Sequence, residues 1–331
     1  MERPLVSFCL LFYNHREWFK AALDAAFAQT YRPLEIVVSD DASTDGSPEL
    51  IQDYVAAHAP ADVSIVINRN TCNLGVMGNW LKTLSLTHGE LLIMAGGDDV
   101  SLPERTERIV AAWLADGKRA AVVSHAGYRV DTRGRSLGPL PAPCTKQPLG
   151  ALMAWRRDCY TAFPPEAIRP RCVEDVPFAK RAMMLGGELV IPDRLVLYRL
   201  GSGLTSALYD HRTPVIKSWR MSLLSLDQTE HDLAAIADRL PPERVEELRR
   251  QFDRERVFAQ NHLALVESPS FRTRWTAFQR ERSMGRYNSY VFLLLYLLPR
   301  RLGDLVLNTI TRLNQLRRRL SQGSGRACRG H

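Results

Sequence analysis

Residues 34–48 have the sequence LEIVVSDDASTDGSP, and this stretch decides the fold class. Residues 34–39 are rich in branched apolar side chains, which predicts a strand, and two aspartates follow the strand at once. Ser47 before Pro48 predicts a helix N-cap followed by proline in the first turn, so we expect a helix through Val55. A buried strand, an acidic turn and a helix in this order form one half of a βαβ unit.

The same alternation continues on both sides of this stretch. Residues 5–13, LVSFCLLFY, form a continuous apolar run that is typical of a strand buried on both faces. Residues 101–104, SLPE, match a capping box and predict a helix that ends near Asp116. Further strands are predicted over residues 63–68, 91–94 and 120–124, and further helices over 16–27 and 75–86. Strands that alternate with helices predict an α/β fold with a mostly parallel sheet flanked by helices.

The second half of the chain has a less regular pattern. Residues 129–149 are rich in glycine, proline and arginine and predict a loop. Beyond them we expect helical pieces near 152–160 and over 176–185, strands at 188–191 and 195–200, and helices from 216 onward. These patterns predict two regions, an α/β domain over residues 1–215 and a helical, arginine-rich extension over residues 216–331.

Length and composition are those of a globular protein. The chain has 331 residues, of which 45% are hydrophobic and 24% charged, and these values exclude wholesale disorder. Residues 249–331 hold 17 arginines, no lysine and five acidic residues, a net charge of +12, so the remainder carries −4 of the chain's +8. The six cysteines include no C-x-x-C pair, which leaves zinc-ribbon and thioredoxin-like classes without support and favours a reducing compartment. Because no segment has the features of a signal peptide or a transmembrane helix, we expect a cytoplasmic protein.

Polar residues and glycines gather where the predicted strands end. Those that follow the first four strands are Tyr13 and Asn14, Asp40 and Asp41, Asn73 and Gly75, and Gly96, Gly97, Asp98 and Asp99. In an open parallel sheet, ligands bind beyond the carboxyl ends of the strands. Two acidic pairs on neighbouring strand ends repel each other unless a cation or hydrogen-bond donors lie between them, and carboxylate oxygens suit Mg²⁺ or Mn²⁺. The sequence therefore predicts a ligand site with a divalent metal at this edge.

Two common nucleotide-binding motifs are absent. A dinucleotide site needs G-x-G-x-x-G directly after the first strand, and Asn14-His15-Arg16-Glu17 stands there instead. No G-x-x-x-x-G-K-[ST] segment occurs, which excludes a P-loop.

Five segments, taken in order, resemble the family 2 glycosyltransferases of the GT-A fold. They are PLVSFCLLFYN (4–14), LEIVVSDDASTDGS (34–47), NLGVMGNW (73–80), GELLIMAGGDDVSLPER (89–105) and VEDVPFAKR (173–181). The resemblance covers residues 4–200 and implies a GT-A-type, Rossmann-like domain. It also implies an inverting transfer of one sugar from a nucleotide-diphosphate-sugar to an acceptor hydroxyl, with Mg²⁺ or Mn²⁺ as cofactor.

The resemblance also implies roles for individual residues. Asp40 and Asp41 contact the nucleoside, and Asp98 and Asp99 touch the ribose and the metal-bound diphosphate. Asp175 is the catalytic base. Tyr13, Asn14, Asn73 and Gly75 join the donor-binding residues because they follow strand ends at the same edge.

The chain departs from the family pattern at three places. Gly96 and Gly97 stand where the family commonly has Asp-Ser, which leaves Asp99 as the expected protein ligand of the metal. Leu11-Phe12 replaces the usual Pro-Thr before Tyr-Asn. Processive members carry Q-x-x-R-W, whereas residues 271–275 here have the sequence FRTRW, without the glutamine. The last departure favours transfer of a single sugar over polymerisation.

Each motif also has a purely structural interpretation. The aspartates at the three sites can cap turns and helix starts, and the lone histidines His15, His88 and His125 fit surface or satisfied core positions better than metal ligation. Arg199, with Ser202, Thr205 and Ser206, is a weaker candidate for a phosphate contact. His211 is a weak candidate for an extra metal or phosphate contact. Two other functions remain open: a nucleotidyltransferase of similar fold, and a nucleic-acid-binding protein that uses the basic tail. The acidic body and the lack of a recognised module argue against a nucleic-acid partner.

The C-terminal segment predicts contact with a membrane surface. Residues 290–298 are strongly apolar but too short to span a bilayer, and residues 302–320 have an apolar stripe with a basic face. We expect this helix to lie on the anionic inner face of the cytoplasmic membrane, which suits a lipid-linked glycan as acceptor in a bacterial envelope pathway such as O-antigen synthesis. The alternative is that the stripe packs on the protein's own core or on a partner.

Overall fold

The computed structural model describes residues 3–145, 148–164, 175–201, 212–283 and 297. The described residues up to 201 form one compact unit together with residues 224–249, and we call it the sheet unit. Those of 212–223 and 250–297 form a second, the helical unit. The predicted segments 290–298 and 302–320, the cluster 202–206 and His211 lie outside the described residues, apart from Leu297. No helix within the described ranges is long and apolar enough to cross a membrane.

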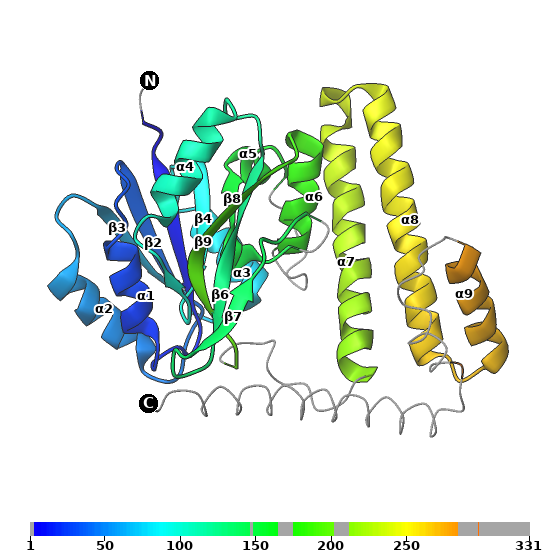
Figure 1. Cartoon of the computed structure of the whole chain (residues 1–331), viewed down its shortest axis with the longest axis horizontal. Coiled ribbons are helices and arrows are strands. Elements are labelled where there is room, and N and C mark those ends of the chain that lie inside the picture. The colour runs from blue at the N-terminus through cyan, green and yellow to red at the C-terminus, as the bar shows by residue number, and fades with distance from the viewer. Residues whose placement is uncertain (1–2, 146–147, 165–174, 202–211, 284–296, 298–331) are drawn as a thin grey trace, which may run out of the picture. The chain divides into compact units, whose positions relative to one another are not determined.

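Within the described residues, nine strands form one curled sheet in the sheet unit (Figure 1). The strand order is β3-β2-β1-β4-β8-β6-β9-β5, and β7 pairs with β6. The parallel core comprises β3 (Ser64–Arg69), β2 (Leu34–Asp40), β1 (Val6–Phe12) and β4 (Leu91–Gly96). The antiparallel β8 (Met153–Arg156) joins it to β6 (Val122–Val130), which pairs in parallel with β9 (Glu188–Arg199). This is the predicted α/β fold with a mostly parallel sheet.

Helices cover both faces of the sheet and pack against it through apolar side chains. Buried residues of α1 (Phe19–Phe27), α2 (Ser47–His58) and α4 (Arg105–Ala115) share one core with β1 and β2. Buried residues of α3 (Gly75–Leu84), α5 (Asp158–Thr161) and α6 (Asp175–Leu185) share the other core, which includes Trp80, Trp155 and Phe178. Since both faces are buried, the strands have the continuous apolar runs that predicted them.

Three predictions for the second half of the sheet unit were wrong. The predicted loop 129–149 contains the end of β6 and a hairpin partner, β7 (Ser136–Leu140). The predicted helix 152–160 is a 3-10 turn, η1 (Gly150–Leu152), then β8 and the short α5, because β8 is buried between β4 and β6. The two strands predicted over 188–200 are one strand, β9, whose register shifts opposite His125 and Ala126 and so accommodates the interior proline.

Two predicted helix starts also differ from the structure. Gly46, with a φ of 80°, is the N-cap of α2, so Ser47 lies inside the helix. Glycine takes this backbone conformation without strain. Ser101 belongs to the short β5 (Val100–Ser101), and α4 begins at Arg105. The Ser101 hydroxyl accepts a hydrogen bond from Arg105 Nη1 at 2.9 Å and is therefore not a cap.

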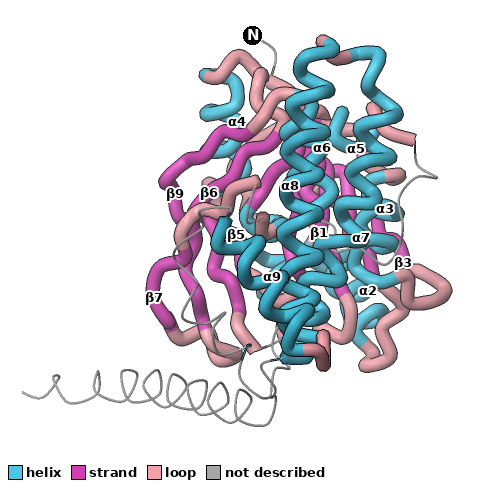
Figure 2. Tube along the Cα trace, turned by 90° about the vertical axis from the view of Figure 1, so that its right-hand side faces the viewer, coloured by secondary structure: helices cyan, strands magenta, loops and turns pink. Residues whose placement is uncertain are grey.

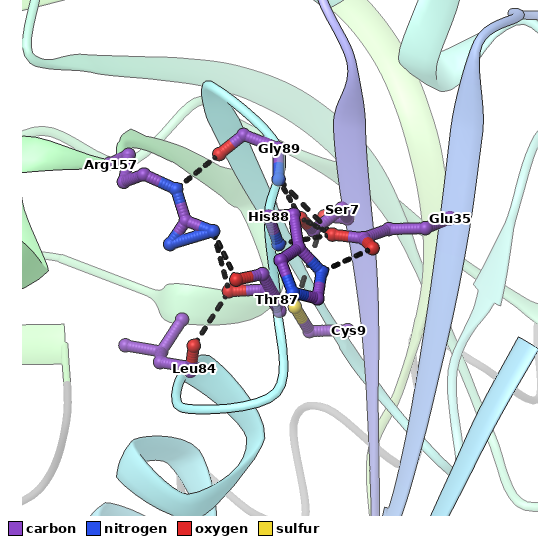
Figure 3. A network of polar contacts seen from close by, with 8 residues as sticks. All are labelled: Ser7, Cys9, Glu35, Leu84, Thr87, His88, Gly89 and Arg157. Carbon is purple, nitrogen blue, oxygen red and sulfur yellow. Dashed lines mark hydrogen bonds and ion pairs between the residues drawn. The ribbon is translucent and has the colours of Figure 1, made fainter. Parts of the chain in front are cut away.

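A polar network closes the amino edge of the sheet, opposite the predicted site (Figure 3). Glu35 on β2 is 6% exposed and accepts hydrogen bonds from Ser7 Oγ, His88 N and Gly89 N at 2.5, 2.5 and 3.1 Å. Arg157 donates to the carbonyl oxygens of Gly89 and Thr87 in the same loop. The network fixes the loop that leads into β4.

Helices follow the sheet. They are α7 (Arg212–Ile236), the 3-10 turn η4 (Ala237–Arg239), α8 (Pro242–Glu267) and α9 (Phe271–Ser283). The end of α7 packs within the sheet unit, where Arg181 on α6 forms a fully buried ion pair with Asp232, with N–O distances of 2.7 and 2.8 Å. Residues 224–249 are thus part of the unit that holds the sheet.

Candidate active site

The ends of β1, β2 and β4 lie in register at one edge of the sheet. Phe12 pairs with Asp40, and Leu11 pairs with Gly96. The main-chain N–H groups of Asp41 and Gly97 donate to Phe12 O and Leu11 O at 2.9 and 2.8 Å. The polar turns after the three strands therefore meet around the end of β1, as the sequence predicted from the polar residues that follow each strand.

Asp40 organises the first of these turns. Its carboxylate, 2% exposed, accepts hydrogen bonds from Ser43 N at 2.9 Å and Ser43 Oγ at 2.5 Å. Ser43 Oγ in turn accepts from Asn14 N at 2.8 Å, and Asn14 Oδ1 accepts from Thr44 N at 2.9 Å. Asn14 has a φ of 55°, a left-handed conformation that asparagine tolerates better than most residues. Tyr13, next to it, is 44% exposed.

Asp41, which follows Asp40 at the end of β2, contacts the residues that lead into α3. Its Oδ1 accepts hydrogen bonds from Asn70 Nδ2 at 2.9 Å and Leu74 N at 2.8 Å. Asn73 Oδ1 accepts from Gly75 N at 2.9 Å, and Gly75 has a φ of 74°. Asn73 and Gly75 therefore form the tight turn that brings α3 to Asp41.

A buried network of hydrogen-bonded asparagine side chains holds this turn in place. Asn79 Oδ1 accepts hydrogen bonds from Ser39 Oγ and Asn70 Nδ2 at 2.6 and 3.0 Å, and Asn68 Nδ2 donates to Asn70 Oδ1 at 2.9 Å. The sequence did not single out Asn70 or Asn79, although both are polar residues next to predicted buried elements.

Asp98 and Asp99 direct carboxylate oxygens toward the same point above Gly96. A Cβ added to Gly96 would lie 2.8 Å from Asp98 Oδ1 and 3.2 Å from Asp99 Oδ2. A Cβ on Gly97 would lie 2.3 Å from the Phe12 ring. The two glycines are therefore required here, the first to leave the carboxylates room to converge and the second to let the turn cross Phe12.

Asp99 is the more buried of the pair and is 6% exposed. Burial, reinforced by the neighbouring Asp98 carboxylate, raises the pKa of Asp99 well above its ordinary value. A hydrogen bond from Arg199 N to Asp99 Oδ1, 2.8 Å long, and the charge of Arg105 act in the opposite direction.

Arg105 is a fully buried cation beside this pair. Its guanidinium donates to His125 Nε2 at 3.0 Å and to the carbonyl oxygens of Met94 and Ala151 at 3.0 and 2.8 Å. Burial lowers the pKa of Arg105 to about 9. The donated bond leaves the proton of neutral His125 on Nδ1, which lies 2.8 Å from Ala126 O. His125 is thus a satisfied core residue, as the sequence indicated.

Arg199, at the end of β9, clamps the acidic turn. Besides its main-chain bond to Asp99, its side chain donates to Asp98 O at 2.8 Å and to the carbonyl oxygens of Asp131 and Thr132, each at 3.0 Å. The sequence suggested Arg199 as a weak phosphate ligand. The structure shows its guanidinium engaged with main-chain carbonyl groups.

Asp175 is the first residue of α6, and one of its carboxylate oxygens is buried without a hydrogen-bond partner among the described residues. Burial raises the pKa of Asp175 to about 6, against the effect of hydrogen bonds from the main-chain N–H groups of Val176 and Gly150. Gly150 belongs to η1, whose Ala151 is bound by Arg105. Asp175 therefore lies at the same edge of the sheet as the end of β4.

A divalent cation at this edge of the sheet would need oxygen ligands from the protein. Among the described residues, no cluster of three or more His, Cys, Asp or Glu side chains could hold a metal alone. Asp98 and Asp99 nevertheless offer two converging carboxylate oxygens. Mg²⁺ is usually bound by one or two carboxylates together with phosphate oxygens of a substrate. The pair fits such a cation when a diphosphate supplies the remaining ligands.

The curled, mostly parallel sheet with acidic turns at its carboxyl edge is the fold of the GT-A glycosyltransferases. Residues 7–163 match the family described as Glycosyl transferase family 2, and this part of the chain belongs to that family.

Curated relatives resemble only part of the chain. An uncharacterized protein of Mycobacterium tuberculosis is 41% identical over 88 residues, which are 26% of this chain and 25% of that protein. The abequosyltransferase RfbV of Salmonella typhimurium is 36% identical over 97 residues, 29% of this chain and 28% of that protein. The chain thus spans about a quarter of the length of the first curated relatives that it matches.

Solved structures resemble nearly the whole chain in fold. S. aureus TarS 1–349 in complex with UDP-GlcNAc has a TM-score of 0.54 at 16% identity, and the match covers 87% of this chain and 90% of that one. The mannosyltransferase PcManGT of Pyrobaculum calidifontis, in complex with GDP-Man and Mn²⁺, has a TM-score of 0.54 at 18% identity over 92% and 88% of the two chains. At these identities the likeness establishes the fold alone.

Proposed function

We propose that the protein is an inverting, metal-dependent glycosyltransferase that moves one sugar from a nucleotide-diphosphate-sugar to an acceptor hydroxyl. The observation that carries the proposal is the convergence of Asp98 Oδ1 and Asp99 Oδ2 above Gly96, at the edge that also holds Asp40, Asp41 and Asp175. Two structural neighbours are complexes with UDP-GlcNAc and with GDP-Man and Mn²⁺, which supports a donor of this class.

The turns after β1 and β2 would bind the nucleoside. Asp40 and Asp41 are held rigidly by Ser43, Asn70 and Leu74 N, so the site is formed before the donor arrives. Tyr13 and Asn14 lie beside them, and the turn at Asn73 and Gly75 closes the same side. Such preorganised polar groups lower the cost of ordering a bound ligand.

Asp98 and Asp99 would hold Mg²⁺ or Mn²⁺, with Asp99 as the predicted ligand. When bound, the cation stabilises the negative charge that grows on the leaving diphosphate. Arg199 keeps the acidic turn in place through its bonds to Asp98 O and Asp99 Oδ1.

Asp175 would take the proton of the attacking hydroxyl. A general base works best when its pKa is close to the operating pH, and burial raises the pKa of Asp175 to about 6. One of its oxygens is buried and has no hydrogen-bond partner among the described residues, so an acceptor hydroxyl that reached this oxygen would meet no competing donor there.

The proposal also covers the acceptor of the sugar. We infer a lipid-linked glycan, presented to a cytoplasmic enzyme that rests on the inner face of the membrane. The similarity to RfbV, named an abequosyltransferase, supports a role in O-antigen-type synthesis. The basic charge of residues 249–331 supports contact with anionic lipid.

A donor panel tests the proposal. The protein is incubated with a set of nucleotide sugars and Mn²⁺, and release of nucleoside diphosphate by slow donor hydrolysis is measured. We expect one donor to be hydrolysed, with the activity lost in excess EDTA and in Asp99→Ala. Full activity in excess EDTA would show that the metal assignment is wrong, and hydrolysis of none of the donors would contradict the transferase assignment.

A further inference from the structure

His15 follows the end of β1 and packs against the acidic turn after β4. A Cβ added to Gly97 would lie 2.7 Å from His15 Nδ1, so the imidazole lies directly on the main chain of that turn. The residue before it, Asn14, is hydrogen-bonded to Ser43 Oγ in the turn after β2. His15 therefore lies where the proposed nucleoside site and the proposed metal site meet.

Two aromatic rings hold the imidazole in place. Phe12 and Trp18 each meet it edge to face, with ring centroids 6.2 and 6.1 Å away and planes inclined by 67° and 68°. Aromatic pairs of this geometry are favourable and directional. Arg199, which clamps the acidic turn, has its Cζ atom 5.9 Å from the centre of the Trp18 ring. The imidazole is thus oriented by packing before a ligand binds.

The ring of His15 lacks a hydrogen bond that a buried imidazole normally has. Its Nδ1 is buried and has no partner among the described residues, although the residue as a whole is partly exposed. His15 is therefore not a satisfied core residue, in contrast to His125. Buried N–H groups without an acceptor are rarer in proteins than buried acceptors without a donor. We therefore assign the proton of the neutral ring to Nε2.

The charged groups around His15 are carboxylates. Burial lowers the pKa of His15, whereas the charges of Asp98, Asp45 and Asp40 act in the opposite direction. Asp40 and Asp45 are already bonded to main-chain N–H groups and serine hydroxyls. Carboxylates only accept hydrogen bonds, so they suit the hydroxyl groups of a ligand or a cation. His15 adds an N–H donor to this surface, and an N–H donor suits phosphate oxygens, which only accept.

We propose that His15 Nε2 donates a hydrogen bond to a phosphate oxygen of the bound nucleoside diphosphate. The inference rests on the proposed function, because it takes the donor site at this edge of the sheet as given, and it adds a phosphate contact to the residues assigned there. Hydrogen bonds to charged acceptors are among the stronger ones in proteins. Because Phe12 and Trp18 already orient the ring, little side-chain freedom is lost when the bond forms.

The test measures binding to the full chain by isothermal titration calorimetry in the presence of Mg²⁺. The probes are ADP, CDP, GDP, UDP and dTDP, together with the matching nucleosides. Three variants separate the donor atom from the packing. His15→Gln places an amide N–H donor near the position of Nε2, His15→Asn places one near Nδ1, and His15→Phe keeps an aromatic ring without a donor.

We expect the unchanged protein to bind at least one of the diphosphates. His15→Gln should bind it within about threefold of the unchanged protein, whereas His15→Asn and His15→Phe should bind it about tenfold or more weakly. The affinity for the nucleoside should stay the same in all three variants, since it has no phosphate. The matched control is His58→Phe, which removes an exposed imidazole at the end of α2 and should bind the diphosphate like the unchanged protein.

Three results would overturn the inference about His15 alone. They are unchanged diphosphate binding in His15→Asn and His15→Phe, an equal loss in His15→Gln and His15→Asn, and an equal loss of nucleoside and diphosphate binding, which would show that the variants distort the turns. If the unchanged protein binds none of the diphosphates, the donor assignment of the proposed function is wrong and the contact from His15 falls with it.

Discussion

Asp175 and Asp99 are both carboxyl groups whose pKa is raised by burial, but their surroundings differ. Asp99 lies next to a second carboxylate and accepts a main-chain hydrogen bond from Arg199. Asp175 has one oxygen without a partner among the described residues. The first arrangement suits a cation, and the second suits transfer of a proton.

Replacement of Asp175 by asparagine should lower kcat by about 10²–10⁴-fold while donor binding is kept, since the shape remains but the proton acceptor is lost. Because the carboxylate form is the active one and the pKa is about 6, kcat of the unchanged protein should fall as the pH drops below about 6. Steady-state rates with the hydrolysed donor, measured across pH, check both outcomes. A variant with normal turnover would place the base elsewhere.

The acidic residues of the site could be predicted from the sequence, but the groups that form hydrogen bonds with them could not. Asp40, Asp41, Asp98 and Asp99 are visible because strand ends and turns are local features of the sequence. Their partners lie far along the chain, as Asn70 is 29 residues from Asp41 and Arg199 is 100 residues from Asp99. A single sequence contains no signal for such pairings, so the clamp formed by Arg199 could not be predicted.

At the scale of elements, the parallel half of the sheet was predictable and the antiparallel half was not. β1, β2 and β4 are buried on both faces and have continuous apolar runs. β8 has only four residues, and a short apolar run such as the one that holds Met153 and Trp155 fits a helix as well as a strand. β7, with its glycine and proline, has the composition of a loop and is a strand through its pairing with β6.

The ion pair between α6 and α7 should matter for stability. Arg181→Met leaves Asp232 as a buried charge, although Gln228 still donates to it at 2.9 Å, and should cost about 3–5 kcal/mol of unfolding free energy. The double variant Arg181→Met/Asp232→Leu removes both charges and should recover most of that loss. Denaturant unfolding of the two variants measures the difference. Equal losses in both would show that packing around Arg181, and not its charge, is responsible.

Glu35, in the polar network at the amino edge of the sheet, should make the free energy of unfolding depend on pH (Figure 3). Burial by itself raises the pKa of Glu35, but hydrogen bonds from Ser7, His88 and Gly89 together lower it below its ordinary value. Its contribution is therefore present above the ordinary glutamate pKa and is lost as the pH falls through the lower folded value. Glu35→Gln should cost about 1–3 kcal/mol at neutral pH. The difference in free energy of unfolding between this variant and the unchanged protein, measured by urea unfolding, should become smaller below about pH 4. A difference that stays constant with pH would contradict this account.

At the scale of the whole molecule, the sheet unit includes residues beyond the predicted boundary at 215. Leu226, Leu233 and Ile236 are buried, and Asp232 pairs with Arg181 inside this unit. The helical pattern from residue 216 was visible in the sequence. Which part of it packs with the sheet was not visible, because two long amphipathic helices have similar patterns along their whole length.

Two truncations test the extent of the sheet unit. A chain that ends at residue 215 lacks the partner of Arg181 and the apolar side chains of α7, so it should be insoluble or unfolded. A chain that ends at residue 249 keeps both and should unfold cooperatively on heating, as followed by circular dichroism. The Cα trace in Figure 2 shows α6 and α7, the helices that carry Arg181 and Asp232. A stable, folded chain of 215 residues would support the predicted boundary at residue 215.

The bond from Arg199 N to Asp99 has a consequence for how the protein is made. The two residues are 100 positions apart, so the ribosome adds the second about 5–20 s after the first. During that interval the nascent chain holds Asp98 and Asp99 without the strand that fixes them. The acidic turn is held in place only once β9 joins the sheet, after the other strands of the sheet have been synthesised.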